Sequence, residues 1–165
     1  MLYNEEEYEI YRNHVLKKRN ISDQKISRLT ITSYCGYCLP EDGLFCEKLI
    51  LAETHVWYEA EYLSADGSRY VRWRKQSDAD TFRKSYGNMI EVFRRLQKQD
   101  PDPRNLVTDT PTLKIVVLYE DGTRGSYDCI QGLPCLKEFC TSLKAMIPQD
   151  KTMPQFLNQE YCFMD

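Results

Sequence analysis

The chain has 165 residues, of which 42% are hydrophobic, and its formal net charge at pH 7 is −3. That length fits a single domain over residues 1–165, and the apolar content is enough to build a core without disulfide staples. No run of 18 apolar residues occurs, so we expect no membrane-spanning helix. Seven cysteines is an odd number, and the first residues lack the basic-then-apolar order of a secretory signal, so we expect reduced thiols in the cytoplasm.

Charge is distributed unevenly along the chain. Residues 1–68 carry a net charge of −5, residues 69–98 carry +6 and residues 99–165 carry −4. A basic block between acidic flanks is typical of an anion-binding face, and equally of a segment that pairs with its own flanks.

The first element that we expect is a helix that begins after Asn4. Its first turn would be Glu5–Glu7, whose carboxylates suit the positive end of the helix dipole, and the Asn4 side chain can cap it. Tyr8, Tyr11 and Val15 recur at helical spacing and would form its apolar face.

A four-stranded antiparallel meander is predicted next, because β-branched and aromatic residues alternate between clear turn signals. The expected strands are residues 28–39, 44–53, 55–63 and 69–75. Pro40–Gly43 has the composition of a turn, and Asp66-Gly67 is the strongest hairpin signal in the chain.

The clearest helical pattern spans about residues 78–99, with Ser77 and Asp80 placed as a capping box. Its apolar stripe consists of Phe82, Tyr86, Ile90 and Phe93. We expect this stripe to pack on the sheet face that carries Val56, Tyr58, Ala60, Tyr62, Val71 and Trp73.

A second hairpin and a last helix complete the predicted order. Strands are expected at residues 112–120 and 124–130, followed by a helix over about residues 134–146. Residues 149–165 are too apolar for a solvated tail, so we expect them to dock on the domain. Because strands and helices are segregated, we predict one α+β domain. Its antiparallel sheet would have about six strands, a meander of four and then a hairpin, with helices packed on it.

Cys35 and Cys38 have the spacing of a zinc knuckle or a redox pair. If the hairpin closes at residues 40–43, Tyr37 faces Cys46 and both thiols lie within a strand, where residues three apart point to opposite faces. No second CxxC exists. We therefore predict structural thiols with no metal and no cofactor, and keep a cysteine-dependent enzyme or metal-binding module as an alternative.

The stretch RYVRWRK combines aromatic and basic residues as nucleic-acid-binding strands do. A two-residue loop at residues 66–67 would however pair Glu61 with Arg72, and Glu59 with Arg74, as a stabilising surface pattern. The remaining basic residues form the outer face of the long helix, and we take this face as the candidate partner-binding site. Its members are Arg83, Lys84, Arg94, Arg95 and Lys98.

No glycine-rich phosphate loop, GxSxG or HExxH motif is present, and His14 and His55 stand in no catalytic pattern. The chain contains 12 tyrosines, a residue type that suits interfaces. We therefore expect a non-catalytic cytoplasmic binding or regulatory domain that acts through protein–protein interaction, for example as an inhibitor of a larger complex. The first alternative is a nucleic-acid-binding protein that uses residues 69–98, and the second is the cysteine-dependent enzyme or metal-binding module.

The thiol prediction can be tested by elemental analysis of protein purified without chelator. We expect no stoichiometric zinc, because the two sulfurs of a strand-borne pair cannot converge on one ion. About one zinc per chain, lost when Cys35 and Cys38 are both changed to serine, would contradict this expectation.

Overall fold

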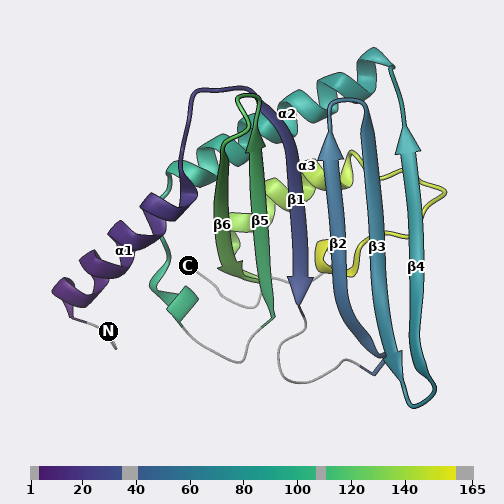
Figure 1. Ribbon diagram of the computed structural model, residues 1–165, viewed down its shortest axis with the longest axis horizontal. Coiled ribbons are helices and arrows are strands. Elements are labelled where there is room, and N and C mark those ends of the chain that lie inside the picture. Colours follow the sequence, from purple (N-terminus) through teal and green to yellow (C-terminus); the bar gives the residue numbers. More distant parts are fainter. Residues whose placement is uncertain (1–3, 35–40, 107–110, 159–165) are drawn as a thin grey trace.

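The computed structural model describes residues 4–34, 41–106 and 111–158, and it has an α+β fold (Figure 1). Its elements are α1 (Glu5–Arg19), β1 (Ile26–Tyr34), β2 (Leu44–Ala52), β3 (His55–Ser64), β4 (Gly67–Gln76), α2 (Asp80–Lys98), η1 (Pro103–Leu106), β5 (Thr112–Tyr119), β6 (Arg124–Ile130), η2 (Pro134–Leu136), α3 (Lys137–Lys144) and η3 (Gln155–Leu157). The strands form one sheet in the order β4-β3-β2-β1-β5-β6, and every neighbouring pair is antiparallel. The predicted fold class, with its meander of four strands and later hairpin, is confirmed.

The hydrophobic core lies between one face of this sheet and a layer made by α2, α3 and η3 (Figure 1). Strand residues alternate between buried and accessible positions, as the two-residue period of a strand requires. The core side chains therefore all project toward the helices. In Figure 1 these helices lie behind the sheet, and the face toward the viewer carries none of them.

The stripe of α2 packs on the sheet as predicted. Tyr86 and Phe93 are buried, while Phe82 and Ile90 are half-buried against the same core. The Phe93 ring lies 5.5 Å from that of Phe139 in α3, which joins the two helices. The predicted sheet face is also the one they cover: Val56, Tyr58, Ala60 and Trp73 are buried, and Tyr62 and Val71 are partly buried.

The predicted capping box of α2 is wrong. The helix begins at Asp80 after Ala79, and no side chain caps it. The Ser77 amide donates to the Thr54 carbonyl, which holds Ser77 beside the β2–β3 turn, and its hydroxyl accepts from the Ala79 amide instead. Ser77 is therefore held at the end of the sheet by these hydrogen bonds and does not cap α2.

Helix α1 begins as predicted, with a reciprocal capping box between Asn4 and Glu7. At its other end Arg19 is buried, and its guanidinium donates to the carbonyls of Gln97 and Gln99 at the end of α2. The chain passes so close to β6 that a Cβ on Gly125 would lie 2.0 Å from the Arg19 carbonyl oxygen. Glycine is therefore required where α1 crosses the edge strand.

The predicted register of the β3–β4 hairpin is wrong by two residues. Ser64 pairs with Gly67, so the loop is Ala65-Asp66. Glu59 consequently faces Arg72 and bonds to it, and Arg74 faces Trp57. A shift of two leaves every side chain on its predicted face. The observed register places Trp73 opposite Tyr58, with ring centroids 5.5 Å apart, so it gains an aromatic contact in the core.

The β1–β2 register also differs from the prediction, since Cys46 faces Tyr34 and not Tyr37. Strand β1 as described ends at Tyr34, and Cys35 and Cys38 lie outside the described residues. That these two thiols point to opposite faces of a strand therefore stays a prediction.

A buried carboxylate, Glu47 of β2, holds the C-terminal segment against the sheet. It accepts hydrogen bonds from the Tyr58 hydroxyl (2.7 Å) and from the amides of Gln155 (2.6 Å) and Phe156 (3.1 Å). Burial raises the pKa of Glu47, and the three donated bonds oppose that shift. Phe156 and Leu157 are buried beneath this cluster, while residues 159–165 lie outside the described part of the chain.

Phe93→Ala should lower the free energy of unfolding by about 3–5 kcal/mol, because it empties a fully buried aromatic site. Urea unfolding of the two proteins measures this difference. Ile10→Ala is the matched control, since Ile10 is 65% exposed on α1 and its loss should cost less than about 0.5 kcal/mol. Equal losses for the two variants would contradict the assignment of the core.

Glu47→Ala should destabilise residues 151–158 specifically, because it leaves two amides and one hydroxyl without their acceptor. Hydrogen exchange should show faster exchange of the Gln155 and Phe156 amides, with a loss of about 2–4 kcal/mol in unfolding free energy. Tyr58→Phe removes only one donor and should leave those amides protected. Unchanged exchange in Glu47→Ala would show that the carboxylate does not anchor this segment.

Candidate functional site

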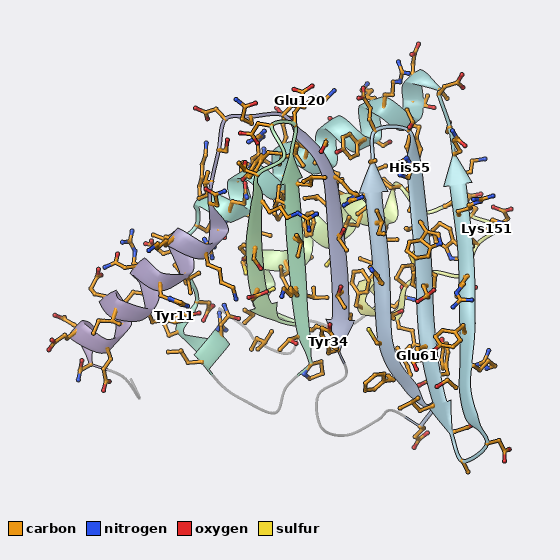
Figure 2. The ribbon with its side chains drawn as sticks, in the orientation of Figure 1. Tyr11, Tyr34, His55, Glu61, Glu120 and Lys151 are labelled. Atoms are coloured by element: carbon orange, nitrogen blue, oxygen red, sulfur yellow. The ribbon has the colours of Figure 1, made fainter. Side chains whose placement is uncertain are left out.

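The candidate site is the sheet face that α2, α3 and η3 leave uncovered (Figure 2). Side chains on this face are half-buried by their neighbours in the sheet or exposed, in contrast to the closed core on the other side. Figure 2 shows His55 at one end of β3 and Glu61 toward the other, and the two ends of the face differ in character. We call it the open face.

A row of side chains crosses the open face through the strand pairings. Val116 of β5 faces Thr30 of β1, Thr30 faces Ile50 of β2, and Ile50 faces Trp57 of β3. All four are half-buried, so each keeps accessible surface that is largely apolar. We call Val116, Thr30, Ile50 and Trp57 the apolar strip. Arg74 of β4 ends the row beside Trp57.

Cations flank the apolar strip on both sides. On one side, Leu118 lies between Arg28 of β1 and Arg124 of β6. On the other side, the flanking cations are Lys114 of β5 and Lys48 of β2. The Lys48 ammonium lies 5.9 Å from the centroid of the Trp57 ring.

Within residues 4–34, 41–106 and 111–158 these cations form no ion pair, although Lys48 lies opposite Glu59 in the β2–β3 pairing. None of the ion pairs among the described residues includes Arg28, Lys48, Arg74, Lys114 or Arg124. Asp128, which faces Lys114 across the β5–β6 pairing, bonds to Lys18 of α1 instead. The open face therefore carries positive side chains that are not in ion pairs with the described acidic residues.

Two depressions lie next to each other on the open face, and the side chains of Arg28 and Ile50 line both of them. Their volumes are about 620 and 330 Å³. The residues that line them are Arg28, Thr30, Lys48, Ile50, His55, Val56, Trp57, Arg74, Lys75, Gln76, Val116, Leu118 and Arg124. Among the described residues, none with an acidic side chain lines either depression. We call the two depressions together the cross-sheet groove.

The far end of the open face is polar and internally paired. Arg72 bonds to Glu59, and Glu61 accepts hydrogen bonds from the hydroxyls of Ser68 and Tyr70. The Arg72 guanidinium also lies 4.6 Å from the Tyr70 ring centroid. Because these acids and aromatics already have partners, we take the groove end near His55 as the candidate binding region.

The basic residues predicted on the long helix lie on the other side of the molecule, on the outer surface of α2. These five side chains differ in their contacts. Arg94 is half-buried and donates to the carbonyls of Ser22 and Gln24, so it ties the α1–β1 connection to α2. Arg95 bonds to Glu138 of α3 at 2.6 Å. Arg83, Lys84 and Lys98 are exposed and take part in no ion pair within residues 4–34, 41–106 and 111–158.

Cys46, Cys129 and Cys135 have little nucleophilic character. Burial raises the pKa of Cys46, Cys129 and Cys135, so their thiolate forms are scarce at neutral pH. Cys129 and His14 line the same small cavity of about 150 Å³ between α1 and β6, but the Cys129 side chain is buried in the core. Within the described ranges, no group of three or more His, Cys, Asp or Glu side chains is placed to hold a metal ion.

No helix in the part of the chain that the structure describes has both the length and the apolar character needed to cross a membrane. No protein-family model matches the chain, and no curated protein or solved structure gives a match either. The charges and the apolar strip of the open face are therefore the observations that bear on function.

Proposed function

We propose that this chain is a non-catalytic binding or regulatory domain that holds another protein on its open face, in the cross-sheet groove. The observation that supports this proposal is a set of five cations, in no ion pair among the described residues, around a half-buried apolar strip. Such a combination is unusual for a surface that only faces water, and it is typical of the centre and rim of an interface.

A bound partner would cover apolar surface and meet positive charge on the open face. Trp57 and Ile50 keep apolar surface whose removal from water is favourable, and aromatic anchors of this kind dominate binding energy at many interfaces. Arg28, Arg74 and Arg124 would add charge complementarity, which accelerates association and selects acidic partners. A regulatory role, such as inhibition of a larger complex, would follow if the covered segment is one that the partner needs.

Reduced thiols support a cytoplasmic setting for this proposal. Cys46, Cys129 and Cys135 are free, as expected in a compartment that keeps thiols reduced. The raised pKa of each also supports a non-catalytic role.

Nucleic-acid binding is the second candidate, and the absence of acids from the groove lining favours it. The aromatic side chains weigh against it. Within residues 69–76, Trp73 is buried in the core and Tyr70 bonds to Glu61. Among the described residues, Trp57 is the one aromatic residue that lines the cross-sheet groove, whereas single-stranded nucleic acid is usually held on several stacking rings.

Affinity capture from an extract of the native cell tests the proposal, followed by calorimetry with the purified partner. We expect the combined change Arg28→Glu and Arg74→Glu to weaken partner binding by about tenfold or more, because both charges sit at the groove. The matched control is Arg83→Glu with Lys84→Glu, which alters net charge equally on the opposite side of the molecule. Melting temperatures should stay close to that of the unchanged protein in both cases.

Loss of binding in the control variant alone would contradict the proposal and assign binding to the outer surface of α2. Capture of nucleic acid, with affinity falling steeply as salt rises, would favour the second candidate.

A further inference from the structure

We propose that the occupant of the cross-sheet groove is an acidic amphipathic α-helix of the partner protein, lying across the strands with its apolar side on the apolar strip. This inference rests on the proposed function and specifies its ligand. It follows from the direction, length and charge pattern of the groove.

The apolar strip runs across strands, which excludes recognition by strand addition along it. β1, β2, β3 and β5 are each paired on both sides, so their backbone groups are already used within the sheet. A ligand that crosses them must satisfy its own backbone hydrogen bonds. An α-helix does so internally, and laying an apolar helix face into a groove is a common mode of peptide recognition.

The dimensions of the apolar strip fit a short helix. From Val116 to Trp57 the strip spans three strand-to-strand steps, which is about 14 Å at the usual strand spacing. A helix of about nine or ten residues has that length. Such a segment presents apolar side chains at positions i, i+3, i+4 and i+7 along one face.

The flanking charges fit the sides of the same helix. Arg28 and Lys48 lie two residues along their strands from Thr30 and Ile50, about 7 Å to either side of the apolar strip. A helix is about 10–12 Å wide with its side chains, so acidic residues on its flanks would lie beside these cations. Arg124 and Lys114 repeat the arrangement over β6 and β5. A basic helix would meet repulsion on both sides.

A synthetic helical peptide provides the direct test. The probe has about four helical turns, a side-chain staple on its outer surface, leucines on one face and glutamates on both flanks. The protein is otherwise unchanged, and Trp57→Phe is the spectral control, because the chain has two tryptophans and Trp73 is buried in the core. We expect saturable binding with a blue shift of Trp57 emission, since the peptide would shield the indole from water.

Two variants separate the apolar and the charged contributions. Ile50→Thr keeps a β-branched side chain in the strand and removes apolar contact, and Lys48→Glu with Arg124→Glu reverses one charge on each flank. Each should weaken peptide binding by about tenfold, whereas Arg83→Glu with Lys84→Glu should change it less than about twofold. A peptide of the same composition with its leucines scattered, a peptide with lysine flanks, and a single-stranded oligonucleotide serve as competing ligands.

Equal affinity for the scattered-leucine peptide would overturn the inference, because binding would then depend on charge alone. Tighter binding of the oligonucleotide, or displacement of the peptide by it, would overturn it in favour of nucleic acid. If the peptide fails to bind while the captured partner remains sensitive to Arg28→Glu with Arg74→Glu, the helix is wrong and the proposed function stands. If neither responds, both are wrong.

Discussion

The structure depends on a single constraint: a six-stranded sheet has two faces, and of the described helices α2, α3 and η3 all cover the same one, while α1 lies against the edge strand β6. α2 and α3, with the segment around Phe156, close one face into a core. The other face must then be made compatible with water by its own residues. It achieves this with Arg28, Lys48 and Arg124 around half-buried Ile50 and Trp57. The surface available for function is thus a direct result of how the core is built.

Two buried charged side chains attach α1 and the segment around Phe156 to the rest of the fold. Arg19 binds the last carbonyls of α2, where the negative end of the helix dipole favours a cation. Glu47 binds the amides of Gln155 and Phe156. Each charge is surrounded by groups of opposite polarity, because an ion without partners in this position would be too costly. Attachment of α1 and of the C-terminal segment therefore relies on directional bonds as well as apolar contact.

Much of the fold could be predicted from the sequence, since it follows from local patterns. The Asn4 cap, the stripe of α2 and the alternation of the strands are each set by neighbouring residues. The predicted registers of the β1–β2 and β3–β4 strand pairs were wrong. The Asp66-Gly67 dipeptide suggested a loop one residue later than the observed Ala65-Asp66, and the observed register places Trp73 opposite Tyr58 in the core. The five cations of the open face come from five separate strands, β1, β2, β4, β5 and β6, so no single stretch of sequence shows that they gather, whereas the basic residues of α2 are close together in the sequence.

The central position of β1 has a consequence for how the protein is made. Its partner β2 follows it closely, but its other partner, β5, begins only at Thr112. During synthesis the meander can assemble from successive hairpins while β1, with Leu29 and Ile31, remains an edge strand with unpaired backbone groups. The last major step in folding is then a long-range pairing, which is slow because a large loop must close before the contact forms. Until β5 has been synthesised, the unpaired backbone groups of β1 can pair with strands of other chains. Rapid pairing of β1 with β5 would therefore limit aggregation of the newly made protein.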